Sequence, residues 1–255
     1  MTAALTEAGL TFEGAQAFAT PRRLTLSVTG MLAESPSVVE ERKGPKADAP
    51  EKAIEGFLRG AGVSLDALET REPPKGQVLF AKINKPGRPA DEIVGPALEQ
   101  IVRAFPWPKS MRWGAGSLRW VRPLHSILCQ LSEGEAGRVV PVEVDGIVAG
   151  NVTFGHRFLA PGAIQVTGFA DYEAKLAAAH VTLRAEARAA VIWQDATQTA
   201  ADAGLDVVED AGLLAEVAGL VECPFVLMGP IAEDFLGLQP EVLQASMKEH
   251  QKFFS

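Results

Sequence analysis

The fold is decided by residues 138–167, which read RVVPVEVDGIVAGNVTFGHRFLAPGAIQVT. Short strand-like runs, divided by turns such as Asp145-Gly146, are expected at 138–144, 150–159 and 163–167. An Ala-rich helix is expected to follow from Phe169 to about Ala203, and Gly204 suits its end. Because strands come in one run and helices in the next, the sequence predicts an α+β fold of short mixed or antiparallel sheets packed with helices.

The part of the chain before this stretch mixes both kinds of element. Alternation of Leu24, Leu26 and Val28 with polar residues predicts a strand over 22–29. The charged stretch 34–49 reads as a loop. The other expected elements are a helix end at Gly9, a helix from Pro50 to Gly62, a short helix from Ser64, a turn at 73–76, a strand around 78–83 and a helix over 90–105 that contains Pro96.

The part after residue 204 is expected to be mainly helical. A short helix over 212–220 precedes a buried strand at 223–228, and Pro240 opens a last helix. We expect two domains: an N-terminal α+β region over 1–110, and a region over 111–255 that is rich in strands and then helical.

Composition excludes several classes of protein. The 255 residues are 47% hydrophobic, and apolar runs are far shorter than the roughly 20 residues of a membrane span. Two cysteines, Cys129 and Cys223, provide neither a disulfide scaffold nor a CxxC site, and the N-terminus lacks a secretory signal, so a cytoplasmic location without membrane contact is expected. The net charge of −8 is concentrated in residues 171–241, which hold thirteen acidic and three basic residues.

The most unusual stretch, residues 105–125, is basic and aromatic. It holds three of the four tryptophans and no acid, and its cations are Lys109, Arg112, Arg119 and Arg122. One interpretation is a surface for a phosphate-rich partner, in which Arg grips phosphate and rings stack on bases. The other is a β-region whose tryptophans form core and whose arginine stems cover it. Arg112 and Arg119, which flank the turn at 114–116, are the better-founded pair for binding.

No catalytic or metal-binding residue is predicted. The stretch 114–116 lacks the third glycine of a dinucleotide loop and has no GK[ST]. The four histidines have no metal-ligand spacing, and no serine lies in a GxSxG elbow. Spacing alone therefore leaves the function open.

Seven short motifs, taken in order, resemble the N-terminal third of the bacterial glycyl-tRNA synthetase β subunit. They are Thr20-Pro-Arg-Arg-Leu24, Lys43-Gly-Pro45, Lys109-Ser-Met-Arg-Trp-Gly114, Trp120-Val-Arg-Pro-Leu-His125, Gly155-His-Arg-Phe-Leu159, Leu213-Leu-Ala-Glu-Val-Ala-Gly-Leu-Val221 and Met247-Lys-Glu-His-Gln-Lys-Phe-Phe254. The family's HD-like and anticodon-binding regions do not follow, so we expect a chain truncated at its C-terminus.

The resemblance implies an α2β2 glycine–tRNA ligase, a heterotetramer that uses ATP. The α subunit would hold the class II centre that forms the adenylate, while this chain, with no catalytic residue and no cofactor of its own, would contact the α subunit and tRNA(Gly). A B3/B4-like module is implied within 111–255. His156 and Arg157 join the four cations as candidates for tRNA binding or subunit contact, with Phe158 expected to pack. The alternative is a free-standing RNA-binding or editing-like module without an α partner.

Overall fold

A computed structural model describes residues 1–71, 77–134 and 136–255, which form two compact units. The first unit comprises Met1–Phe12 and Gly30–Leu98, and the second comprises Glu13–Thr29 and Glu99–Ser255. Each unit therefore contains two separate pieces of sequence. The domain boundary expected at residue 110 stays a prediction, and the turn expected at 73–76 lies outside the described residues.

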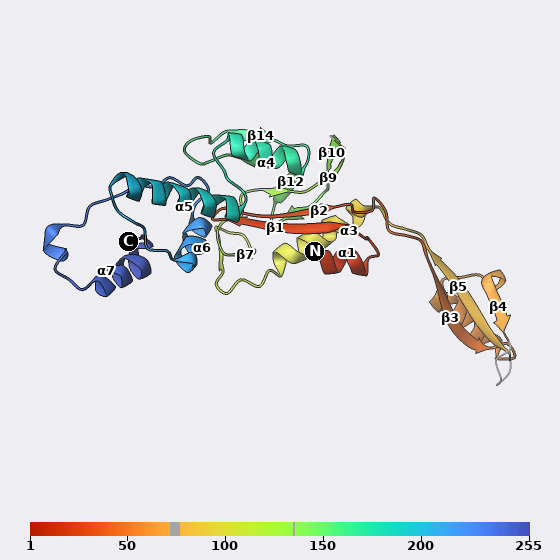
Figure 1. Cartoon of the computed structure of the whole chain (residues 1–255). Helices are drawn as coiled ribbons and strands as arrows, with labels where there is room; N and C mark the ends of the chain where they lie inside the picture. The colour runs from red at the N-terminus through yellow and green to blue at the C-terminus, as the bar shows by residue number, and fades with distance from the viewer. Residues whose placement is uncertain (72–76, 135) are drawn as a thin grey trace. The chain divides into compact units, whose positions relative to one another are not determined.

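The first unit contains a three-stranded antiparallel sheet in the order β3-β5-β4 (Figure 1). Its strands are β3 (Val38–Lys46), β4 (Leu68–Arg71) and β5 (Val78–Lys85). Helix α2 (Glu51–Ala61) and the 3₁₀ turn η1 (Leu65–Ala67) connect β3 to β4. Gly62 ends α2 in the left-handed conformation, with φ +66°, as expected of a glycine after a helix.

Strand β3 corrects the loop expected at 34–49. The charged residues that suggested a loop lie on an exposed strand and pair across the sheet: Glu41 with Arg71 at 2.6 Å and Glu40 with Lys85 at 2.5 Å. The register is irregular between Lys43 and Lys46, which accommodates Pro45. Cross-strand pairing, which composition does not reveal, makes this segment a strand.

The two remaining helices of this part are α1 (Thr2–Glu7) and α3 (Ala90–Arg103). Helix α3 begins in the first unit, contains Pro96 as expected, and continues into the second. Leu5, Leu10 and Ala90 are each at most 1% exposed and lie in the core.

The second unit contains short strands in five small sheets. The hairpin of β1 (Gly14–Thr20) and β2 (Arg23–Thr29) includes the predicted strand 22–29. A mixed sheet has the order β11-β12-β8, with β12 parallel to β8, and the others are the pairs β6–β7, β9–β10 and β13–β14. The bounds are β6 Met111–Arg112, β7 Arg119–Trp120, β8 Ile127–Leu128, β9 Gln130–Glu133, β10 Ala136–Val139, β11 Glu143–Val144, β12 Ile147–Gly150, β13 Val152–Phe154 and β14 Ala163–Gln165.

Helices follow the strands, as predicted. The single helix expected over 169–203 is two helices, α4 (Phe169–Ala178) and α5 (Ala185–Asp202). Val181 and Leu183 lie between them and join Val166, Tyr172 and Leu176 in a buried cluster, so core packing interrupts the helix. The remaining elements are α6 (Ala211–Leu220), the 3₁₀ turn η2 (Glu233–Phe235), α7 (Pro240–Ser246) and the π-helical turn η3 (Met247–Gln251).

The predicted buried strand at 223–228 is wrong. This segment belongs to no helix or strand, and the side chains of Phe225 and Leu227 are each 81% exposed. The overall prediction of an α+β fold with short antiparallel and mixed sheets is confirmed. None of the helices in the described residues has the length and apolar character that crossing a bilayer requires.

Candidate nucleic-acid interface

The basic and aromatic stretch forms a small hairpin after helix α3. Pro106 and Pro108 follow the helix closely and prevent its continuation. Strand β6 then pairs with β7, with Met111 opposite Trp120 and Arg112 opposite Arg119. Directly opposite residues in an antiparallel pair project to the same face, so the hairpin places the two arginines side by side.

The turn of this hairpin is held by one carboxylate. Asp145 accepts hydrogen bonds from Ser117 Oγ at 3.0 Å and from the backbone amides of Ser117 and Leu118 at 3.3 Å. The amide of Leu118, followed by the two groups of Ser117, holds the pKa of Asp145 below its ordinary value. A Cβ on Gly116 would lie 2.3 Å from Asp145 Oδ2, so a larger residue here would displace the carboxylate that holds the turn. The turn is therefore braced from the β11–β12 hairpin.

The aromatic residues divide between packing and exposure. Phe105, Trp107 and Trp120 form a cluster with ring centroids 4.5–5.4 Å apart. Trp113, in contrast, is 41% exposed and enters no ring contact among the described residues. The core interpretation therefore fits Trp107 and Trp120, whereas Trp113 faces solvent and the binding interpretation stays a prediction.

The four cations of the hairpin region lie at the surface. Lys109, Arg112, Arg119 and Arg122 are all exposed, and none forms a salt bridge with any described residue. Arg119 Nη2 lies 3.5 Å from the backbone oxygen of Ser110, the longest hydrogen bond of the site. Arg122 lies beyond the end of β7, so strand alternation does not fix its direction relative to Arg119. Arg112 and Arg119 carry like charges and lie opposite each other, so they repel. No carboxylate among the described residues forms an ion pair with either of them.

The second group of candidates lies in the loop after β13. His156 Nδ1 accepts from the amides of Phe158 and Leu159 at 3.4 and 3.3 Å, and the amide of His156 donates to the carbonyl of Ala179 at 2.9 Å. The guanidinium of Arg157 lies 4.9 Å from the centroid of the Phe158 ring. Phe158 was expected to pack, and that expectation is wrong because its side chain is 76% exposed.

This loop is built closely against the core. A Cβ on Gly155 would lie 2.5 Å from the carbonyl oxygen of Ala160 and 2.6 Å from Ala179 Cβ, so only glycine fits there. No hydrogen bond, ion pair or ring contact among described residues joins the loop to the hairpin cations. His156 and Arg157 are therefore a separate group from the four cations.

A largely buried ion pair contacts the end of β13, just before the 155–159 loop, and the sequence did not reveal it. Glu222 is 6% exposed; Arg23 Nε donates to it at 2.8 Å, and Thr20 Oγ1 at 2.6 Å. Arg23 Nη1 also donates to the carbonyl of Phe154 at 2.9 Å. Burial alone would raise the pKa of Glu222, but the hydrogen bonds from Arg23 and Thr20 together hold it below its ordinary value.

A second buried cation was also missed. Arg188 is 0% exposed, and its guanidinium donates to the carbonyl oxygens of Ala19, Thr182, Leu183 and Ala218 at 2.7–2.9 Å. These oxygens belong to β1, the segment between α4 and α5, and α6, so one side chain joins three parts of the unit. Burial lowers the pKa of Arg188. In the sequence, Glu222 and Arg188 look like ordinary charged residues. Only their partners, which are distant in the sequence, show that these two side chains join parts of the fold.

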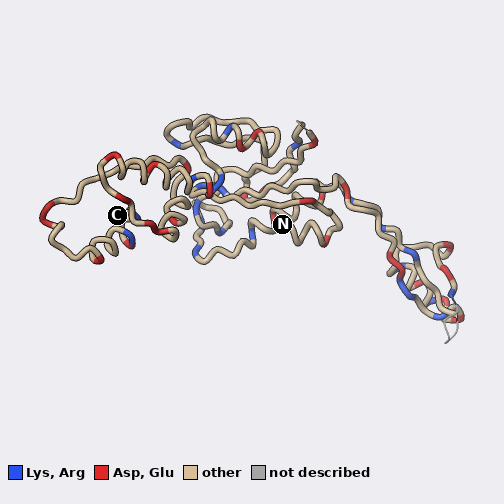
Figure 2. The backbone as a smooth tube through the Cα atoms, in the orientation of Figure 1, with Lys and Arg blue, Asp and Glu red and all other residues tan. Residues whose placement is uncertain are grey.

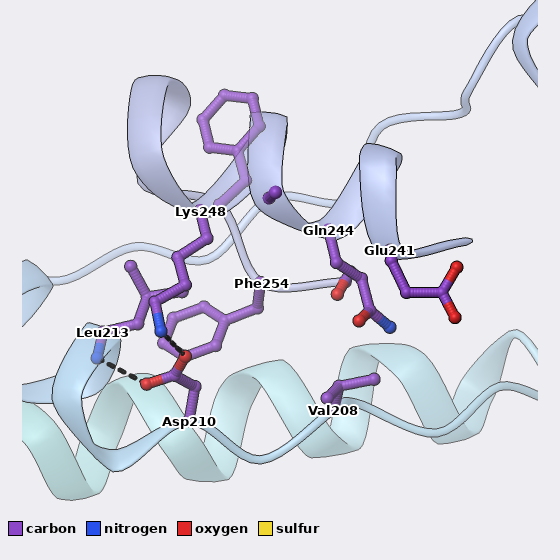
Figure 3. A pocket seen from close by; sticks show the side chains of 10 residues that line it. Val208, Asp210, Leu213, Glu241, Gln244, Lys248 and Phe254 are labelled. Atoms are coloured by element: carbon purple, nitrogen blue, oxygen red, sulfur yellow. Dashed lines mark hydrogen bonds and ion pairs between the residues drawn. The ribbon is translucent and has the colours of Figure 1, made fainter. Parts of the chain in front are cut away.

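One cavity of about 250 Å³ lies between the start of α6 and the C-terminal segment (Figure 3). Two of its charged groups pair with each other: Lys248 Nζ lies 2.6 Å from Asp210 Oδ2, while Asp210 Oδ1 caps α6 by accepting from the amide of Leu213. The carboxylate of Glu241 also lines the cavity. The Lys248 ammonium holds the pKa of Asp210 below its ordinary value. Figure 3 shows this pair together at one side of the cavity, so it docks the C-terminal segment on α6.

Within the described ranges, no three His, Cys, Asp or Glu side chains are grouped so that they could hold a metal ion. Burial raises the pKa of the Cys129 thiol to about 11, so this cysteine is not a reactive thiolate. Among the predicted candidates, the exposed hairpin cations and the 155–159 loop thus lie at the surface, and their role in binding stays a prediction.

Comparisons with known proteins give these surfaces a context. The family model described as glycyl-tRNA synthetase beta subunit matches residues 1–255. The chain is 66% identical over its whole length to the glycine–tRNA ligase beta subunit of Ruegeria sp. (strain TM1040), and covers 37% of that protein. It is 67% identical to the corresponding protein of Dinoroseobacter shibae and covers 35% of it. The chain thus spans little more than a third of the length of these relatives, and it belongs to the glycyl-tRNA synthetase β-subunit family.

Proposed function

We propose that this chain is the non-catalytic, tRNA-binding and assembly portion of a glycine–tRNA ligase β subunit. In the cytoplasm it supports the ATP-dependent attachment of glycine to tRNA(Gly) by an α2β2 enzyme. The class II centre that consumes ATP belongs to the α subunit, and this chain binds no cofactor itself. Family membership and the coverage of the relatives by this chain support the proposal.

The single observation that carries tRNA binding is the pair Arg112 and Arg119. The two guanidiniums project from one face of a braced hairpin and have no carboxylate partner among the described residues. An arginine fork matches the geometry of a phosphate, and two forks on one face suit neighbouring phosphates of a strand. Trp113, exposed in the turn between them, offers a ring on which a base can stack.

Lys109 and Arg122 extend the same cationic stretch on either side of the hairpin. Figure 2 shows Lys and Arg along this part of the trace, which contains no acid. Because each neutralised phosphate releases counterions, four contacts to a duplex region give a log–log salt slope of about −3 to −4. The hairpin is therefore the part of the chain where tRNA affinity depends most strongly on salt.

The loop with His156 and Arg157 supplies a second contact, either to tRNA or to the α subunit. Its exposed Phe158 and the stacked guanidinium of Arg157 form a cation–aromatic surface on a rigid support. If this loop serves assembly, Arg157→Ala weakens association with the α subunit and leaves tRNA binding unchanged. If it serves tRNA, the same variant lowers tRNA affinity and leaves subunit association unchanged. If the folded variant changes neither tRNA affinity nor association with the α subunit, the loop has only a structural role.

A salt titration of tRNA(Gly) binding tests the proposal. The Arg112→Ala/Arg119→Ala variant should bind more weakly, and its slope should be shallower by about 1.8 for duplex contacts or about 1.4 for single-stranded ones. The matched control is Lys82→Ala/Lys85→Ala, which removes two positive charges that are already paired with Glu69 and Glu40. The control should keep the wild-type slope. An unchanged slope in the folded arginine variant would eliminate the hairpin as the tRNA site.

A further inference from the structure

The segment 223–231 has the sequence of a strand but pairs with no strand in the part of the chain that the structure describes. It reads CPFVLMGPI, an apolar run of the kind found in buried strands. Among the described residues, none of its backbone amides or carbonyls forms a hydrogen bond with another backbone group. The residues that flank it, Val221 and Ala232, have extended backbones, with ψ 155° and 141°. The chain is therefore extended at one residue on each side of this segment.

The side chains of this segment are exposed to an unusual degree. Phe225 and Leu227 have the most exposed large apolar side chains in the described parts of the chain, at 81% each, and Val226 between them is half-buried. Further large exposed apolar residues follow at Met228, Ile231, Phe235, Leu236 and Leu238. Contact with a partner would remove these apolar side chains from water, so this surface favours association.

The charge around the segment excludes a nucleic acid as its occupant. Residues 189–247 contain ten acidic residues and no Lys, Arg or His, and this part of the trace is tan and red in Figure 2. A polyanion would be repelled there. An apolar segment with unpaired backbone groups instead fits a protein partner that adds a strand and covers the side chains.

We propose that residues 223–228 form a strand against the C-terminal two-thirds of a glycine–tRNA ligase β subunit. The matched relatives are nearly three times as long as this chain, which corresponds to their N-terminal part, so they contain a large protein surface beyond the matched residues. The matches to these relatives span all 255 residues of the chain. This proposal rests on family membership and not on tRNA binding, so either can fail without the other.

Hydrogen exchange measured by mass spectrometry tests the proposal without any variant. The amides of residues 225–229 should exchange at nearly unprotected rates in the 255-residue chain. In the full-length Ruegeria β subunit, the aligned amides should exchange at least tenfold more slowly, because a strand partner satisfies them. Equal rates in the two proteins would overturn the proposal.

Two further measurements test whether the α subunit or a second copy of this chain covers the segment instead. The first adds the α subunit to the 255-residue chain. If this slows exchange at 225–229 as much as in the full-length β subunit, the α subunit covers the segment and the proposal is wrong. Protection that rises with the concentration of the 255-residue chain alone would identify a second copy and would also overturn it. The proposal predicts neither effect.

A fusion of this chain to the remaining part of the Ruegeria β subunit sharpens the test. Phe225→Asp/Leu227→Asp should restore fast exchange at 225–229 in the fusion, by at least tenfold, and leave the 255-residue chain folded. The matched control is Leu65→Asp/Leu205→Asp, which alters two leucines that are 63% and 59% exposed. Equal exchange in the variant and the control would contradict docking at this segment.

Discussion

Residues 105–125 and residues 189–247 are opposite kinds of surface within the second unit. The first has no acid, an exposed tryptophan on a braced hairpin, and four cations that form no salt bridge with a described residue. The second has ten acids, no basic residue and a row of exposed apolar side chains. One chain can therefore keep a basic surface, which suits a polyanion, apart from an acidic and apolar surface, which suits a protein. The net charge of −8 reveals neither surface.

The arginines themselves differ in the same way. Arg188 and Arg23 bind backbone oxygens and a buried carboxylate, whereas Arg112 and Arg119 project from a hairpin without ionic partners among the described residues. Arg188 and Arg23 join distant parts of the second unit, and Arg112 and Arg119 are not engaged in this way within the described ranges. The predictions below test this division.

The largest effect is expected from Arg188→Leu. The substitution leaves four carbonyl oxygens without their donors in the core, so it should lower the free energy of unfolding by about 3–5 kcal/mol. Urea denaturation followed by circular dichroism measures this loss. Arg112→Leu is the matched control and should change the unfolding free energy by less than about 0.5 kcal/mol. Similar losses in the two variants would show that burial does not distinguish these arginines.

Glu222→Gln should give a smaller effect that depends on pH. The pKa of Glu222 is lower in the folded chain than its ordinary value of 4.5, so its ionisation stabilises the fold above that pH. This stabilisation is lost as the pH falls through the lower, folded pKa. The variant should therefore be less stable than wild type by about 1–3 kcal/mol at pH 7, with the gap closing below about pH 4.5.

Thermal unfolding between pH 3 and 7 measures this gap, with the exposed Glu209→Gln variant as its control. A gap that stayed constant with pH would show that the charge on Glu222 contributes nothing to the Arg23 pair.

Local signals predicted much of the fold. Gly62, Gly204 and Pro240 lie at the helix boundaries that their backbone preferences indicate. The elements that the sequence failed to predict depend on contacts with residues far away in the chain. Strand β3 depends on cross-strand pairing, and the segment 223–228 has a strand sequence without a neighbour. Composition does not show whether a segment finds a neighbouring strand in the fold.

The candidate site was predictable to a similar extent. The sequence identified the four cations and favoured Arg112 and Arg119, which the hairpin register places opposite each other. It could not identify Arg188 or Glu222, because their importance depends on groups as distant in sequence as Ala19 and Thr20. The role of every candidate cation in binding stays a prediction.

The smallest effect is expected from Trp113→Ala. Stacking of one base on an aromatic ring contributes about 1–3 kcal/mol, so tRNA affinity should fall at least fivefold, at unchanged salt slope. Fluorescence anisotropy with labelled tRNA(Gly) measures the affinity. Trp113→Phe should retain most of the binding because it keeps a ring. Equal affinities of the Ala variant and wild type would restrict the hairpin to phosphate contacts.

Photo-crosslinking tests most directly the division between the two surfaces. Transfer RNA(Gly) that carries 4-thiouridine is irradiated with the 255-residue chain, and the crosslinked peptides are identified by mass spectrometry. We expect crosslinks within residues 105–125, with Trp113 among them, and none within 189–247. Crosslinks confined to 189–247, with none in the hairpin, would contradict the assignment of the basic hairpin to RNA and of the acidic segment to protein.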